Sequence, residues 1–138
     1  MLAKTVRFQI QNATGVATAA TDTITLTGEF TQLTTATGVL SVAAQITPIP
    51  ATAGNSLASG AFYNSAAIDT TNAGATLFVE GHFLFTASIS TATPAGPLNV
   101  FLQESPDGGT TWPANGVGQF VGSAYFTAVG TVTAPLEC

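Results

Sequence analysis

The amino-acid sequence predicts one all-β domain, a single antiparallel β-sandwich of about eight strands with a jelly-roll-like architecture. Three observations support this prediction. Apolar and polar residues alternate with a period of two in most segments, as they do in half-buried strands. Threonine, a β-branched residue that favours strands, occurs 24 times in 138 residues. No apolar pattern of helical period survives the density of Thr, Gly and Pro, and at most one helical turn is expected, near residues 54–60.

Four strands are expected in the first half of the chain. Alternating residues predict the first two strands over residues 5–10 and 21–28. The third strand, residues 38–46, is closed by a pair of prolines, and residues 62–68 form a shorter fourth strand. Residues 51–60 between them are small and polar, which is typical of a loop that is mobile or ordered by a partner.

The second half contains the strongest strand signal. Residues 77–89 carry large apolar groups on both faces, so we expect a central strand that is covered on both sides over part of its length. Gly81 in its middle indicates a bend or a close approach of the backbone. Further strands are expected over residues 98–104 and 120–129. Residues 130–138 form a tail that runs either as a short strand or as an extended arm reaching a neighbouring copy, and the whole of 1–138 is one domain.

The chain carries very little charge. Charged residues make up 7% of the sequence, against roughly 25% in average soluble domains, and the formal net charge is −5. The only basic residues are Lys4 and Arg7, too few to neutralise the phosphates of a nucleic acid or to form a polybasic membrane patch. We therefore expect no nucleic-acid and no membrane partner. Lys4 and Arg7 become candidate contacts to an acidic partner surface.

An exterior of Thr, Ala, Ser and Gly has two interpretations. The chain is either a monomer with an unusually neutral surface, or a protein whose exterior is buried against other copies or other proteins. Permanent interfaces are apolar and poor in charge, which favours the second interpretation. The N-terminus lacks the pattern of a signal peptide and no long apolar run occurs, so we expect a chain that folds in a cytoplasm.

Side chains that could perform chemistry are scarce. The sequence has one His, one Cys and seven carboxylates. Glu80 and His82 share a strand face and could approach each other, but a metal site needs more ligands. Glu104 and Asp107 would supply them only if their strand neighbours residues 77–89. A solvated pair is the simpler interpretation, so we predict no catalytic residue, no metal, no cofactor and no enzyme activity.

Two further side chains leave alternatives open. If His82 lies between copies, its protonation at about pH 6.5 would modulate assembly. Cys138 has no partner for a disulfide within the chain, so it is either a free thiol at a frayed end or one half of a bridge between chains.

The clearest turn signal follows the strand at residues 98–104. All fixed positions of the Asp-box pattern S-x-D-x-G-x-T-W are present, namely Ser105, Asp107, Gly109, Thr111 and Trp112. We expect Asp107 to accept backbone N–H bonds, Gly108 and Gly109 to supply positive φ, and Trp112 to cover the hairpin. Asp boxes resemble hairpin turns of sialidase-type propellers, where they recur in several blades. A single box in a short chain predicts a structural turn rather than sialidase activity.

The longer string VFLQESPDGGTTW, residues 100–112, resembles strand segments of tailed-bacteriophage structural proteins of about this size. The resemblance implies a virion protein assembled in the host cytoplasm, most simply a capsid decoration (cement) protein that stabilises the shell. Its implied partners are other copies of itself, with a trimer favoured, and the major capsid protein or another virion protein. The chain departs from that pattern because no Arg-containing strand follows residue 129. The alternatives are a phage tail or fibre component, or a carbohydrate-binding module using Trp112, Tyr63 and Tyr125.

Overall fold

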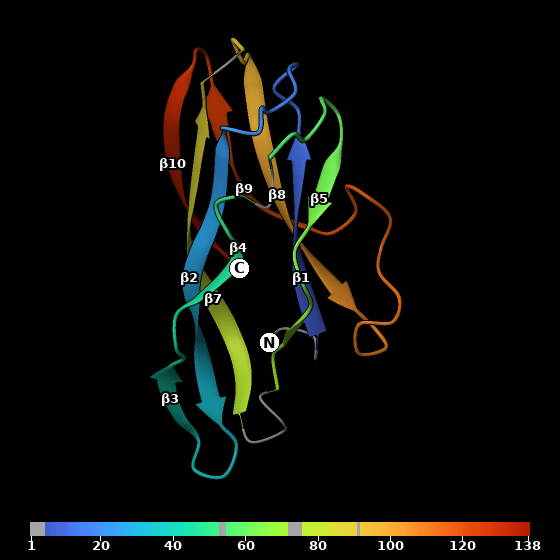
Figure 1. Ribbon diagram of the computed structural model, residues 1–138. Coiled ribbons are helices and arrows are strands. Elements are labelled where there is room, and N and C mark those ends of the chain that lie inside the picture. The colour runs from blue at the N-terminus through green and yellow to red at the C-terminus, as the bar shows by residue number, and fades with distance from the viewer. Residues whose placement is uncertain (1–4, 53–54, 72–75, 91) are drawn as a thin grey trace.

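The computed structural model describes residues 5–52, 55–71, 76–90 and 92–138 (Figure 1). These residues form ten strands and no helix. The strands make two antiparallel sheets that pack face to face, which confirms the expected all-β sandwich. The jelly-roll form of that expectation stays a prediction. Among the described residues, no helix is long and apolar enough to cross a membrane.

Sheet A holds the N-terminal strand in its centre. Its strand order is β5-β1-β8-β9, and β6 pairs with the same edge of β1 as β5, at the opposite end. The bounds of its strands are β1 (Thr5–Asn12), β5 (Phe62–Asn64), β6 (Ile68–Asp69), β8 (Gly96–Ser105) and β9 (Gln119–Phe126).

Sheet B is built on the two longest strands. Its order is β10-β7-β2-β3, and β4 pairs with β2 beyond the end of β3. The bounds of its strands are β2 (Thr23–Thr34), β3 (Val39–Val42), β4 (Ile46–Ile49), β7 (Thr76–Ile89) and β10 (Gly130–Glu137). The β2–β3 hairpin projects from one end of the sandwich, at the bottom of Figure 1.

Ten strands replace the expected eight or so because two of the expected strands divide. Residues 38–46 become β3 and the start of β4, and residues 62–68 become β5 and β6. Pro48 was expected to close a strand but lies inside β4, and Pro135 lies inside β10. Both strands lie at the edge of sheet B, where a residue without an N–H group is tolerated. The tail after residue 129 runs as a strand within its own chain, because β10 pairs with β7 along its whole length.

The core fills the space between the sheets. It takes alternate residues of β1, β2, β7 and β8, and a chain of Phe rings crosses it. The ring of Phe83 lies edge-on to Phe8 at a centroid distance of 4.8 Å and to Phe30 at 5.0 Å. Such edge-to-face pairs contribute beyond the area that they bury.

Two glycines let the long strands approach each other's side chains. A Cβ at Gly28 would overlap the carbonyl oxygen of His82 and the ring of Phe83. A Cβ at Gly81 would lie 2.8 Å from the sulfur of Cys138, so the close approach expected at Gly81 is present.

The expectation of β7 covered on both faces is wrong. A bulge opposite Thr31 and Gln32 turns Phe78 toward the core, where its ring stacks on Phe30 at 4.7 Å. The outer face of β7 then carries Glu80, His82 and Leu84, which are exposed. Since Phe78 leaves that face, no second apolar layer is needed there.

Candidate functional site

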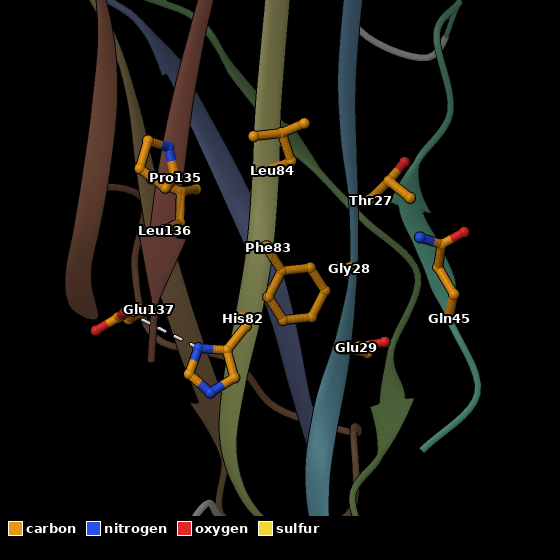
Figure 2. Close-up of a pocket in the computed structure, with 10 residues that line it drawn as sticks. All are labelled: Thr27, Gly28, Glu29, Gln45, His82, Phe83, Leu84, Pro135, Leu136 and Glu137. Atoms are coloured by element: carbon orange, nitrogen blue, oxygen red, sulfur yellow. Dashed lines mark ion pairs between the residues drawn. The ribbon is translucent and has the colours of Figure 1, made fainter. Parts of the chain in front are cut away.

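The outer face of sheet B contains a shallow depression of about 350 Å³ around His82 (Figure 2). Strands β2, β7 and β10 form its floor, and Gln45 lies on its rim just before β4. Strand register aligns Glu29, His82 and Glu137 in one row across these three strands. The chain's single histidine therefore lies beside three carboxylates here, those of Glu29, Glu80 and Glu137.

The ion pairs in this depression are long and exposed to solvent. His82 Nε2 lies 3.5 Å from Glu80 Oε1, and His82 Nδ1 lies 3.9 Å from Glu137 Oε1, the pair drawn in Figure 2. About half or more of each of these side chains is exposed to solvent. Exposed ion pairs of this kind contribute little to stability. The approach of Glu80 to His82 that strand alternation suggested is present, as a solvated pair.

A metal ion at this depression would need further ligands beside His82. Among the described residues, no three His, Cys, Asp or Glu side chains are placed to hold a metal ion. Glu104 and Asp107 cannot join His82, because β8 lies in sheet A and pairs with β1 and β9 rather than with β7. The condition under which they would have completed a metal site is not met.

A second cluster forms the corner after β8, at Ser105–Trp112. One carboxylate organises it: Asp107 Oδ1 accepts hydrogen bonds from the N–H groups of Thr110 (3.1 Å) and Thr111 (2.8 Å). Asp107 Oδ2 accepts one from the Thr111 hydroxyl (2.8 Å), and the Ser105 hydroxyl donates to Oδ1 (2.9 Å). Gly108 and Gly109 have φ of 72° and 98°, in the region that glycine adopts without strain.

These hydrogen bonds perturb the acidity of Asp107. The backbone N–H and then the hydroxyl of Thr111 are the main causes, and they lower the pKa of Asp107 from 3.8 to about 2. Desolvation opposes these two bonds, and weaker hydrogen bonds from Ser105 and Thr110 add to the lowering. The carboxylate is thus fully occupied within its own turn, and its chemistry is that of a structural cap.

Trp112 and Arg7 interact with each other beside this corner. The Trp112 indole N–H donates to the Gly109 carbonyl (3.1 Å), and the Arg7 guanidinium carbon lies 4.4 Å from the centroid of the indole ring. Arg7 Nε also donates to Gln103 Oε1 (2.9 Å). Partial burial lowers the pKa of Arg7, which stays charged at neutral pH. Arg7, a candidate partner contact, is therefore engaged within the chain; Lys4, the other candidate, lies outside the described residues.

Two glutamines hold the loop at residues 113–118 against the outer face of sheet A. Gln9 and Gln103 alternate with core residues, yet both are fully buried. Gln103 Nε2 donates to the carbonyls of Ala114 (3.0 Å) and Val117 (2.8 Å). Gln9 Oε1 accepts from the N–H of Gly116 (2.7 Å). Sequence alternation places both amides on the solvent-exposed face of the sheet, and the contact with the loop at residues 113–118 buries them.

Asp22 and Cys138 are two further titratable groups with structural roles. Burial acts to raise the pKa of Asp22, but hydrogen bonds from Ala19 N, Ser90 N and the Ser90 hydroxyl prevail, so the pKa is lowered. Burial raises the pKa of Cys138 to about 11 against a weak opposing bond to Gly81. The backbone N–H and carbonyl of Cys138 both pair with Gly81, so this residue is not frayed. A thiol with so high a pKa is a poor nucleophile at neutral pH.

The third feature is the edge strand β3. Among the described residues it pairs with β2 alone, and all four of its residues are exposed. Val39, Leu40 and Val42 are 57%, 61% and 60% exposed. Leu40 and Val42 pair with Leu33 and Thr31, which alternate with the buried Phe30, so both side chains lie on the outer face of sheet B.

The three side chains suggested for sugar stacking lie in different surroundings. Tyr63 packs against the core from β5, and the ring of Trp112 has Arg7 over one face. Tyr125 on β9 is 63% exposed. The structure does not bring these three residues together on one surface, since they lie on the inner face of β5, in the β8–β9 loop and on the outer face of β9.

Comparison of the chain with protein-family models, with curated proteins and with solved structures gives no match. The function must therefore be inferred from the chain's own residues. Among the described residues, the His82 depression holds no three side chains placed to bind a metal ion, and Asp107 accepts hydrogen bonds from within its own turn. The features that stay open to a partner are the edge strand β3 and the outer faces of the two sheets.

Proposed function

We propose that the protein is a homo-oligomeric structural protein of a virus particle, most simply a capsid decoration (cement) protein. The observation that supports this best is the uncharged, apolar and unpaired edge of β3. Decoration proteins stabilise a shell by adding contacts between copies and neighbours. Such a function depends on an adhesive surface, and the exposed edge of β3 fits that requirement.

The backbone of β3 is positioned to accept another strand. The N–H of Ala43 donates to the carbonyl of Phe30 at 2.8 Å, and bonding pairs alternate along an antiparallel ladder. The N–H and C=O groups of Leu40 and Val42 therefore point away from β2. An edge of this kind is a template for β-augmentation, in which main-chain bonds give affinity and side chains give specificity.

The charge distribution favours another copy of the same chain as the occupant of this edge. Residues 31–44 contain no charged side chain, whereas the whole chain has a net charge of −5. Two copies carry the same net charge, and the β2–β3 hairpin is a region where they approach without bringing like charges together. Natural edge strands usually carry charges or Pro that prevent such pairing, and β3 carries neither.

The part of the outer face of sheet B that lies farthest from β3 gives a second neutral surface. Hydroxyl side chains form cross-strand contacts there: Thr131 donates to Ser88 at 3.1 Å, and the Thr86 and Thr133 hydroxyls lie 3.4 Å apart. The charged side chains of this face, Glu29, Glu80, His82 and Glu137, lie nearer to β3, so the hydroxyl-rich part fits docking onto a shell surface without desolvating ions.

The self-association part of the proposal is tested by light scattering on the purified chain after size-exclusion chromatography. We expect a mass that is an integral multiple of 13.9 kDa, with a trimer favoured. A clean monomer at all accessible concentrations would contradict the proposal.

The virion part needs a separate experiment. Particles of the virus that encodes the chain are purified by density gradient, and their proteins are identified by mass spectrometry. We expect peptides of this chain in the particle, removed together with shell stability when the gene is deleted. Gold-labelled antibody on the tail rather than on the shell would favour the tail or fibre alternative, and absence from the particle would overturn the proposal.

A further inference from the structure

The outer face of sheet A carries a cluster of amides and aromatic rings that assembly through β3 does not use. We call this cluster the amide–aromatic face. Its members lie on the three neighbouring strands β1, β8 and β9 and are Gln11, Asn99, Phe101, Phe120, Ser123 and Tyr125.

Strand register places these side chains on one surface. Ile10, Val100 and Ala124 are fully buried between the sheets, so their neighbours along each strand point outward. Gln11 pairs with Asn99, and Asn99 pairs with Ser123, which makes one polar row across the three strands. Residues 99 and 123 thus lie side by side although they are far apart in the sequence.

Aromatic rings lie on both sides of this polar row. A register shift between Val100 and Phe101 brings Phe120 opposite Phe101, and their rings make an edge-to-face contact at 5.8 Å and 67°. Tyr125 lies beyond the row, two residues after Ser123. Phe120 is 56% and Tyr125 63% exposed. Residues two apart along a strand are separated by roughly 7 Å, so each aromatic group borders the polar row directly.

The polar row presents both donors and acceptors to solvent. Asn99 Nδ2 donates to Gln11 Oε1 at 3.1 Å, which orients both amides. The Gln11 amide N–H groups and Asn99 Oδ1 make no further hydrogen bond to the described residues. A sugar hydroxyl both donates and accepts, so it can bond to each of these groups. The C–H groups of a pyranose ring are attracted by the electron-rich face of an aromatic ring.

The surface is also held in a fixed shape. The loop at residues 113–118 borders it and is fastened by Gln9 and Gln103, and Gly116 packs near the Phe62 ring. A preformed surface pays less conformational entropy when a ligand binds. None of the six side chains is charged, so an ionic ligand would find no counter-charge there.

We propose that the amide–aromatic face binds an uncharged oligosaccharide. Pyranose rings stack on Phe120 and Tyr125, and hydroxyl groups bond to Gln11 and Asn99. This surface lies on sheet A, whereas the assembly edge lies on sheet B. The two proposals therefore fail independently: loss of sugar binding leaves the oligomeric state unchanged, and the reverse also holds.

The test is an NMR titration of the full-length chain with cellohexaose, mannohexaose, xylohexaose and chitohexaose, each uncharged. We expect saturable shifts of the amide signals of Gln11, Asn99 and residues 120–125 with at least one of them. Phe120→Ala should weaken that binding at least about tenfold, and Asn99→Ala should weaken it as well.

Matched controls separate binding from folding. Leu84→Ala changes an exposed apolar side chain on sheet B and should leave the affinity unchanged. Tyr125→Ala provides a second variant if Phe120→Ala loses its native thermal transition. Absence of binding to all four sugars, binding that survives both aromatic substitutions, or tighter binding of hexagalacturonate would each overturn the proposal.

Discussion

The β8–β9 loop and the β2–β3 hairpin both connect neighbouring antiparallel strands, yet they leave their polar groups in opposite states. In the loop, Asp107 and Gln103 satisfy turn and backbone groups from within the chain. In the hairpin, the outer edge of β3 has no partner among the described residues, and Leu40 and Val42 are exposed.

In a chain with so few charges, this difference distinguishes a segment that stabilises the fold from one that is available to bind another molecule. A connection whose donors and acceptors are used internally contributes to stability. A connection that exposes an unpaired edge and apolar side chains gains more from a partner than from its own chain. The loop contains the most recognisable motif, but the hairpin is the better candidate for contact with another molecule.

The largest stability effect is expected at the loop, for Gln103→Leu. This change leaves the carbonyls of Ala114 and Val117 and the Nε of Arg7 without their partner. Breaking a buried polar network of this size costs roughly 2–4 kcal/mol of unfolding free energy. Urea denaturation of the wild type and the variant measures it.

The matched control is the same substitution in the hairpin. Gln32 is bonded to Ser41 at 3.2 Å on the surface, so Gln32→Leu should change stability by less than about 0.5 kcal/mol. Equal losses of unfolding free energy in Gln103→Leu and Gln32→Leu would contradict the claim that the loop contributes more to stability than the hairpin.

The largest association effect is expected at the hairpin, for the double substitution Leu40→Lys and Val42→Lys. Two cations on the edge of β3 would repel the same edge of another copy. We expect self-association to weaken at least about tenfold, which corresponds to about 1.4 kcal/mol. Sedimentation velocity over a range of concentrations measures it, and the unfolding free energy of the dilute chain should stay nearly unchanged.

Leu84→Lys is the control for added charge. Leu84 is 51% exposed on the outer face of sheet B, away from the β3 edge. An equal loss of association with this variant would show that net charge rather than the β3 edge governs assembly.

Alternation in the sequence is enough to predict the sandwich, because odd and even positions of a regular strand point to opposite faces of the sheet. It places Val6, Phe8 and Ile10 in the core, where they are fully buried. The prediction fails at a bulge, where one extra residue reverses the alternation. Phe78 points inward and Phe120 points outward because of register shifts against their partner strands.

The burial of the two glutamines and the exposure of β3 could not be predicted from the sequence, for a different reason. Gln9 and Gln103 have the pattern of a solvent-exposed face. The loop at residues 113–118 that covers them is 107 residues from Gln9 at Gly116 and 11 residues from Gln103 at Ala114. Leu40 and Val42 have the pattern of a core face, but they pair with Leu33 and Thr31, which lie on the outer face of sheet B. Both outcomes depend on how a segment is placed against the rest of the fold, which local periodicity does not encode.

Acid should weaken the loop selectively through Asp107. Its folded pKa of about 2 lies below the ordinary 3.8, so its contribution is complete above about pH 4 and is lost as the pH falls toward 2. In Asp107→Asn this contribution is absent at every pH. The difference in melting temperature between wild type and variant should therefore be largest at neutral pH and shrink between pH 4 and 2. A difference that stays constant with pH would contradict the role of Asp107 as a charged cap.

Among the substitutions at the β8–β9 loop, the smallest effect is expected for Arg7→Ala. Loss of the contact with the Trp112 ring should cost about 0.5–1 kcal/mol, with a further cost from the lost bond to Gln103. Trp112 is the only tryptophan, so its fluorescence maximum reports the corner directly. We expect a red shift in Arg7→Ala and a smaller one in Arg7→Lys; an unchanged maximum in both would show that Arg7 does not cover the ring.

The most direct test of assembly through β3 is amide hydrogen exchange of the full-length chain at micromolar and at near-millimolar concentration. The N–H groups of Leu40 and Val42 should exchange rapidly in the dilute chain and slow markedly as copies pair along this edge. The N–H of Thr110, already bonded to Asp107, should exchange at the same rate at both concentrations. Unchanged exchange at Leu40 and Val42 in a sample that has become oligomeric would show that the copies assemble through another surface.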